Sequence, residues 1–79
     1  MFKRRRDAEP LTKIEKRASS LPNGDLMGWA ENALYTTERN LFAYQRDKNT
    51  FYLNEAKMGA ESLMAIIKVL ERRNQADER

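Results

Sequence analysis

Glu31 and Glu38 are the residues whose type and spacing come closest to a catalytic arrangement. Residues spaced by seven lie on the same side of a helix, about two turns apart. Paired carboxylates supply the acid and the base in glycoside hydrolysis. A solvated helix flank carries the same pattern, and we interpret Glu31 and Glu38 in that way.

Other residue types that enzymes use are missing or scattered. The chain has no histidine and no cysteine, which removes the commonest general base, the Ser–His arrangements and the imidazole or thiolate metal motifs. The glycines at positions 24, 28 and 59 do not form a phosphate-binding loop. The sequence therefore predicts a protein that is not an enzyme and that binds no cofactor, metal or small-molecule substrate.

Length and composition indicate one small helical domain, which we place at residues 8–79. The chain of 79 residues is 41% hydrophobic and 34% charged and has two prolines, which is typical of globular rather than disordered chains. A core of this size gives a small margin of stability, to which self-association often adds. No apolar run approaches the ~20 residues that span a bilayer, and no apolar segment follows the basic start of the chain. We expect a cytoplasmic protein without a membrane span.

The basic excess lies near the N-terminus. Residues 1–22 hold seven Lys or Arg and three acidic residues, a net charge of +4, whereas residues 23–79 hold eight and nine, a net charge of −1. We predict a flexible basic arm at residues 1–7, with contact residues Phe2, Lys3, Arg4, Arg5 and Arg6. Such an arm binds nucleic acid or an acidic protein in a salt-dependent way, or it only makes the chain more soluble.

Apolar periodicity predicts three helices, at residues 9–20, 25–46 and 50–73. The break at residues 21–24 contains a proline and the turn-forming pair Asn23-Gly24. The candidate N-terminal caps are Asp7 with Pro10 in the first turn, then Asn23 or Asp25, and then Asp47, Asn49 or Thr50. Two long helices joined by a short polar link favour an antiparallel hairpin, on which the short first helix docks.

Each long helix has a predicted core stripe. The stripes consist of Leu26, Ala30, Ala33, Leu34, Thr37, Leu41 and Tyr44 on the second helix, and of Tyr52, Ala56, Gly59, Ala60, Leu63, Ile67 and Leu70 on the third. Small residues in the middle of both stripes would let the two backbones approach closely. Trp29 lies at the margin of its stripe, and we expect it to pack against the hairpin.

Apolar side chains outside these stripes form two ridges. The Phe51 ridge consists of Phe51, Met58, Ala65 and Val69, and the Tyr35 ridge consists of Tyr35 and Phe42. A helix that is apolar on two sides needs two partners, and the narrow first helix is unable to cover both ridges. Which ridge it covers stays open. We therefore predict partner-binding residues at Tyr35, Phe42, Phe51, Met58 and Val69.

Three stretches of the sequence carry a resemblance to other proteins. They are Leu26-x-x-Trp29-Ala30-Glu31-x-Ala33-Leu34, then Tyr44-Gln45-Arg46-Asp47, and then Glu55-Ala56-x-x-Gly59-Ala60-Glu61-Ser62-Leu63. With this order the chain resembles small uncharacterised all-helical proteins of actinobacteria and their phages. The resemblance covers about half of the chain and implies no catalytic or binding residue. It implies a phage accessory protein that acts by contact, in the host cytoplasm.

These patterns predict an all-α fold, in which a long antiparallel helical hairpin carries a short N-terminal docking helix and a flexible basic arm. The leading functional hypothesis is a small interaction module that self-associates and contacts a host or virion protein. The alternative hypothesis is a nucleic-acid-binding accessory factor that uses residues 2–6.

Overall fold

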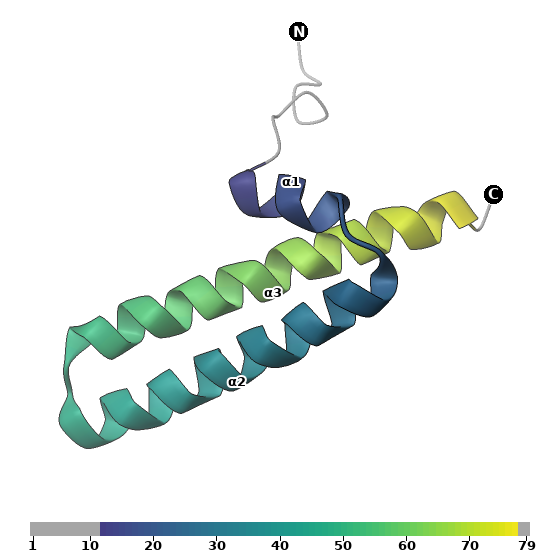
Figure 1. Ribbon diagram of the computed structural model, residues 1–79. Coiled ribbons are helices and arrows are strands. Elements are labelled where there is room, and N and C mark those ends of the chain that lie inside the picture. The colour runs from purple at the N-terminus through teal and green to yellow at the C-terminus, as the bar shows by residue number, and fades with distance from the viewer. Residues whose placement is uncertain (1–11, 78–79) are drawn as a thin grey trace, which may run out of the picture.

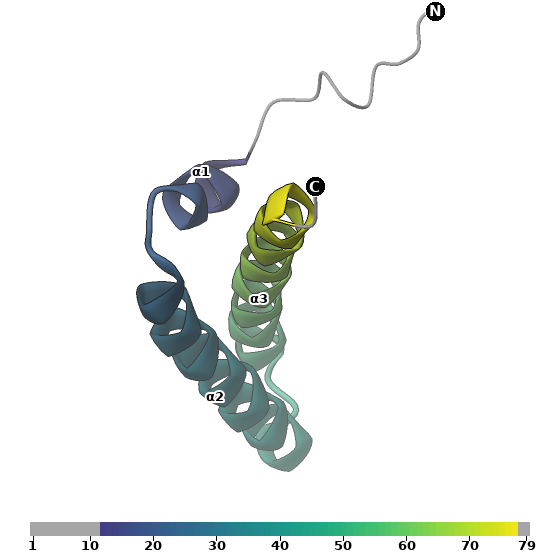
Figure 2. The same cartoon turned by 90° about the vertical axis from the view of Figure 1, so that its right-hand side faces the viewer.

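The computed structural model describes residues 12–77, and over that range the chain forms three α-helices. α1 spans Lys13–Ser19, α2 spans Asn23–Asp47 and α3 spans Thr50–Asp77. α2 and α3 run antiparallel from their shared link, and α1 lies over the middle part of α3, on which it mainly packs (Figures 1 and 2). The predicted all-α hairpin with a short docking helix is confirmed.

α1 begins at Lys13 rather than at residue 9, because Thr12 has extended backbone with φ −69° and ψ 167°. The backbone N–H of Glu15 donates to the Thr12 hydroxyl at 3.1 Å, and the N–H of Thr12 donates to the Glu15 carboxylate at 3.3 Å. This reciprocal capping box satisfies two N–H groups that the start of a helix otherwise leaves without partners. The predicted caps Asp7 and Pro10 lie outside the described residues.

α2 begins directly after Pro22, which occupies the N-cap position with φ −70° and ψ 161°. Proline fixes φ near this value, so the chain leaves the link without a glycine turn. Asn23 and Gly24 are therefore helical, and Gly24 does not have positive φ. The predicted turn at Asn23-Gly24 and the predicted cap by Asn23 or Asp25 are wrong, since the N-cap residue makes no side-chain hydrogen bond to the helix.

The link between α2 and α3 consists of Lys48 and Asn49. Lys48 has left-handed backbone with φ 58°, and its N–H donates to the carbonyl oxygen of Tyr44 at 2.7 Å. The side-chain oxygen of Asn49 accepts from the N–H of Phe51 at 2.9 Å. Asn49, one of the three predicted candidates, thus caps the start of α3.

α3 extends to Asp77, one turn beyond its predicted end, because no glycine or proline interrupts that stretch. In its last turns, the guanidinium of Arg73 donates to the carbonyl oxygens of Ser19 at 3.2 Å and Leu21 at 2.7 Å, and to the side-chain oxygen of Asn23. These bonds join the α1–α2 link to α3.

The hydrophobic core lies where all three helices meet, and its buried cluster consists of Ala18, Leu26, Ile66 and Val69. Trp29 packs against this cluster and is half-buried. The guanidinium of Arg17 lies 5.7 Å from the centroid of its ring. The prediction that Trp29 packs against the hairpin is confirmed.

Small residues form the α2–α3 seam away from this cluster. Ala33, Ala56 and Gly59 are buried there. A Cβ on Gly59 would overlap Oγ1 of Thr37 and lie 3.0 Å from the carbonyl oxygen of Ala33. The predicted close approach of the two backbones is confirmed at these residues.

Three large residues of the predicted core stripes, Leu34, Leu41 and Ile67, are exposed instead. The two backbones approach most closely at Ala33, Ala56 and Gly59, because these residues have little or no side chain. The line of contact between α2 and α3 therefore runs through them. The neighbouring large side chains then lie at the side of the seam. The predicted burial of these three residues is wrong.

Candidate interaction surfaces

α1 covers the Phe51 ridge, but only over its C-terminal half. Ala65 and Val69 are 4% and 3% exposed, whereas Phe51 and Met58, nearer the α2–α3 link, are 56% and 59% exposed. α1 has seven residues and is too short to cover the whole ridge. The prediction that Val69 lies on a partner-binding surface is wrong, because Val69 belongs to the core that α1 and α3 share. Phe51 and Met58 remain available for contacts.

An ion pair holds α1 on this ridge. Nζ of Lys68 donates to Oε2 of Glu15 at 3.3 Å. The pKa of Glu15 lies below its ordinary value of 4.5: the backbone hydrogen bond from Thr12 lowers it most, burial raises it, and the hydrogen bond and charge of Lys68 and the charge of Arg72 lower it further. The ionised carboxylate is therefore part of the folded arrangement.

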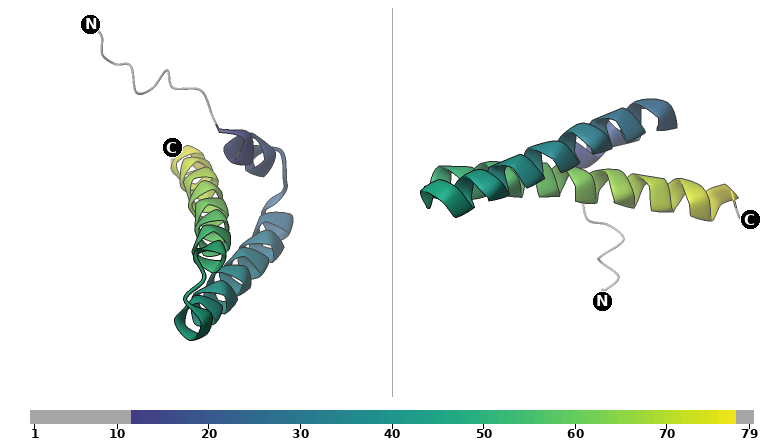
Figure 3. Two further views of the ribbon diagram at one scale, coloured as in Figure 1. Left: turned by 90° about the vertical axis from the view of Figure 1, so that its left-hand side faces the viewer. Right: turned by 90° about the horizontal axis from the view of Figure 1, so that it is seen from below.

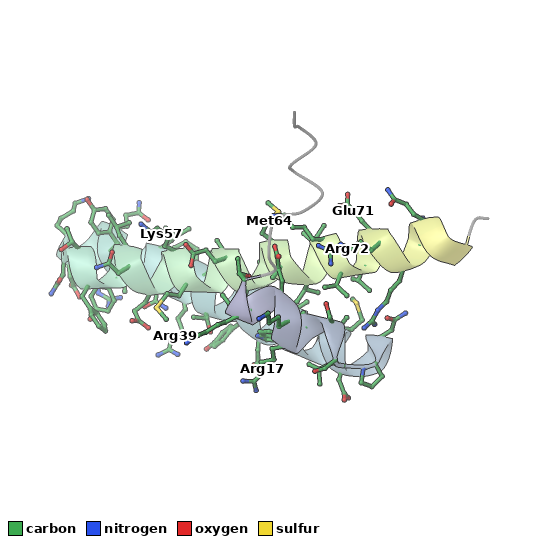
Figure 4. All side chains as sticks on the ribbon, turned by 90° about the horizontal axis from the view of Figure 1, so that it is seen from above. Arg17, Arg39, Lys57, Met64, Glu71 and Arg72 are labelled. Carbon is green, nitrogen blue, oxygen red and sulfur yellow. The ribbon has the colours of Figure 1, made fainter. Side chains whose placement is uncertain are left out.

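A cavity of about 360 Å³ lies beside this ion pair, between α1 and α3. Ile14 and Met64 line it together with the two members of the pair. Figure 4, which looks onto the α1 side of the hairpin, shows Met64 on the edge of α3 near the start of α1. Because Glu15 and Lys68 bond to each other, we interpret the cavity as incomplete packing beneath α1 rather than as an arrangement for chemistry.

The Tyr35 ridge lies on the side of α2 that faces away from α3. Tyr35 and Phe42 are each 60% exposed, and the guanidinium of Arg39 lies 5.7 Å from the centroid of the Tyr35 ring. A groove of about 410 Å³ runs beside Phe42; it is lined by Leu34, Thr37, Glu38, Leu41 and Phe42. The ridge is exposed because α1 docks on the other one.

The structure does not bring the predicted partner-binding residues together. Tyr35 and Phe42 project from the back of α2, and Phe51 and Met58 from the side of α3 on which α1 docks. Phe51 contacts Tyr52 edge to face, with ring centroids 5.5 Å apart and planes at 71°. The two ridges are therefore separate surfaces.

The sequence interpretation missed a third apolar surface. Its large side chains are between 38% and 58% exposed and are Met27, Leu34, Leu41, Leu53 and Ile67. They follow a spacing of seven on both helices, at 27, 34 and 41 and, with Ala60, at 53, 60 and 67. The spacing alone does not separate them from the core, because the buried residues Leu26 and Ala33 are also seven apart.

The remaining predicted sites either show no organised chemistry or lie outside the described range. Glu31 and Glu38 are exposed. Among residues 12–77, no group of three or more acidic side chains is placed to hold a metal ion. The arm at residues 1–7, with its contact residues at 2–6, lies outside the described residues. None of the described helices has the length and apolar character of a membrane span.

No protein-family model matches the chain. Neither a curated sequence nor a solved structure matches it.

Proposed function

We propose that the chain is a small, non-enzymatic helical interaction module that works by contact with proteins, including further copies of itself. The hairpin presents two long helices, and α1 is attached to α3 through the ion pair between Glu15 and Lys68. Apolar side chains on the uncovered helix faces would make the contacts.

The observation that carries this proposal is the balance of exposed and buried apolar groups. Within the described residues, ten large apolar side chains are exposed, whereas the large side chains that are fully buried are Leu26 and Ile66. Extended apolar patches on a protein surface usually mark contact sites, and buried interface cores are rich in aromatic residues and methionine. Phe42, Phe51 and Met58 are of these types.

Affinity capture from a lysate of the native host, together with light scattering of the purified chain over a concentration series, tests the proposal. Phe51→Glu with Met58→Glu places charges at positions that are exposed in a single copy, so the helical circular dichroism should persist. Capture of a protein partner should fall at least ~10-fold, because a charge is costly to bury in an apolar contact.

Asn32→Glu with Gln75→Glu is the matched control. Asn32 of α2 and Gln75 of α3 are exposed and lie away from Phe51 and Met58, so the control adds the same charge without removing apolar surface and should bind as the natural chain does. A chain that stays monomeric, binds no hydrophobic dye and captures no protein in a manner sensitive to these changes would refute the proposed function.

A second candidate function, binding of nucleic acid, is favoured by the uneven charge. Residues 1–22 carry a net charge of +4 and residues 23–79 a net charge of −1. Four cations at residues 3–6 would neutralise about four phosphates, which gives weak and strongly salt-dependent binding. Retention on DNA or RNA should fall at higher salt and after removal of residues 1–6. Retention that responds to neither change would exclude this function.

The resemblance to actinobacterial and phage proteins adds a biological setting to the proposal. In that setting the partner is a host or virion protein in the host cytoplasm. Capture in parallel with nuclease treatment separates a protein partner from one that is bridged by nucleic acid.

A further inference from the structure

An apolar face runs along the side of the hairpin opposite α1. It consists of two rows of exposed residues with a spacing of seven, Met27, Leu34 and Leu41 on α2 and Leu53, Ala60 and Ile67 on α3. These six residues are named the open face. All six residues are exposed in a single copy, so the face is free to contact another molecule.

Helix geometry places both rows on one side. At about 100° per residue, the α2 row lies roughly a quarter turn from Ala33, which faces α3, and on the flank away from Trp29, which contacts Arg17 of α1. The α3 row lies about half a turn from Ala65 and Val69, which α1 covers. The right-hand view of Figure 3 looks at the hairpin from below, with α1 behind it and no other helix in front of α2 and α3.

The relief of the open face suits a helical partner. Leu34 and Leu41 border the groove of about 410 Å³ on α2, and on α3 the small Ala60 separates Leu53 from Ile67. Large side chains repeated every seven residues pack as knobs into the holes between such residues on another helix. An occupant that fills both rows must itself present two helices with this repeat.

We infer that the occupant is a second copy of this chain, whose open face packs on the first to form a four-helix bundle. The inference rests on the proposed function and names the surface that carries self-association. A second copy supplies the same two rows at the same separation, as a symmetric dimer requires. The segment before Thr12 fits poorly, because it contains four consecutive cations and Thr12 lies on the α1 side.

The extent of the open face also fits a dimer. Its five large side chains, each 38–58% exposed, would remove on the order of 1,000 Å² of apolar surface in a pair of copies. Stable interfaces bury roughly 1,200–2,000 Å² in total, so the polar rim has only a modest area to add. Lys57 and Glu71 lie along one edge of α3 (Figure 4). The rim thus carries charges of both signs.

Sedimentation of the full chain over a concentration series tests the inference. The natural chain should form dimers. Leu34→Glu with Ile67→Glu places two charges per copy in the open face and should weaken dimerisation about 100-fold or more. Both side chains are exposed in a single copy, at 58% and 48%, so the circular dichroism should remain helical. Tyr35→Glu with Met58→Glu, which changes equally exposed apolar residues on other faces, should dimerise as the natural chain does.

A single introduced cysteine gives a second measurement, because the chain has none of its own. Labelling of Ala60→Cys by a thiol reagent should slow as the protein concentration rises, whereas labelling of Tyr35→Cys should not. This test decides the matter even if the double glutamate variant does not fold, since alanine to cysteine is a small change at an exposed position.

Three outcomes would overturn the inference. In the first, the natural chain is monomeric at every concentration. In the second, the labelling rate of Ala60→Cys does not change with concentration. In the third, the changes at Tyr35 and Met58 disrupt the dimer and the open-face changes do not. The proposed function is judged separately, by capture of a protein partner that depends on Phe51 and Met58.

Discussion

Replacing Gly59 with alanine should destabilise the hairpin, because the added Cβ has no room at the α2–α3 seam. It would overlap Oγ1 of Thr37 and lie 3.0 Å from the carbonyl oxygen of Ala33. The Thr37 hydroxyl is held in place, since it donates to that same carbonyl at 2.8 Å. Overpacking of this kind costs about 1–3 kcal/mol, with the upper part expected where backbone must move. Alanine regains about 1 kcal/mol through its helix propensity. The net loss is therefore about 1–2 kcal/mol.

Gly28 is the matched control for this prediction. It also lies within a helix, and a Cβ added there would meet no atom within 4 Å beyond its own turn of the helix. Gly28→Ala keeps the gain in helix propensity without the steric cost, so it should stabilise the chain by about 1 kcal/mol. The same chemical change is thus expected to have opposite signs at the two positions.

Thermal unfolding followed by circular dichroism measures both changes, and 1 kcal/mol corresponds to about 4–8 °C in a domain of this size. Protein concentration must be equal in all samples, because the proposed dimerisation would raise the Tm by mass action. Thr37→Ala introduced together with Gly59→Ala removes the overlapping oxygen and should restore part of the loss. Equal upward shifts in Tm for Gly59→Ala and Gly28→Ala would refute the close approach of the two helices.

Three further changes test other contacts. Because the folded pKa of Glu15 lies below its ordinary value of 4.5, the ionised form stabilises the fold above that ordinary value, and this contribution is lost as the pH falls through the folded pKa. Glu15→Gln should therefore be less stable than the natural chain in urea at neutral pH, with the difference shrinking in acid; a constant difference would contradict the role of the charge. Lys48→Gly should raise stability by about 1 kcal/mol by relieving the left-handed backbone, and a loss would mean that the contact of Lys48 with the Tyr44 ring matters more. Arg73→Lys should lower stability by about 1–2 kcal/mol and speed hydrogen exchange in α1, since lysine lacks the planar fork of donors; unchanged exchange would show that Arg73 does not hold the link.

The hairpin was predictable from the sequence because two long periodic segments flank a short polar link. The close approach of the helices was also predictable, since Ala33, Ala56 and Gly59 stand at matching places in the two segments. The start of α1 was not predictable, because the sequence offers two plausible starts, one near Pro10 and one at the capping box of Thr12 and Glu15. The start of α2 was missed for a related reason, as a proline is able to close the link without a glycine turn.

The faces of the long helices were predicted less well than their positions. Periodicity indicates an orientation only when one side of a helix is apolar, and α2 and α3 carry apolar residues around more than half of their circumference. Leu34 and Ile67 were placed in the core by their periodicity, yet the small residues decide where the two helices meet. Val69 was placed on the surface because the sequence does not show where α1 docks. The exposure of Phe51 and Met58 follows from the short length of α1, which the sequence did indicate.

The core cluster joins parts of the chain that are synthesised far apart in time. Ala18 precedes Val69 by most of the chain, and Arg73 bonds to the carbonyls of Ser19 and Leu21 across 54 and 52 positions. A nascent chain that has completed only α1 and α2 therefore lacks most of the surface on which α1 packs, because that surface belongs to α3. α2 and α3 are able to pair first across their short link, and α1 docks when the last turns of α3 have formed. Shortening α3 from its C-terminal end should release the helix at the opposite end of the chain.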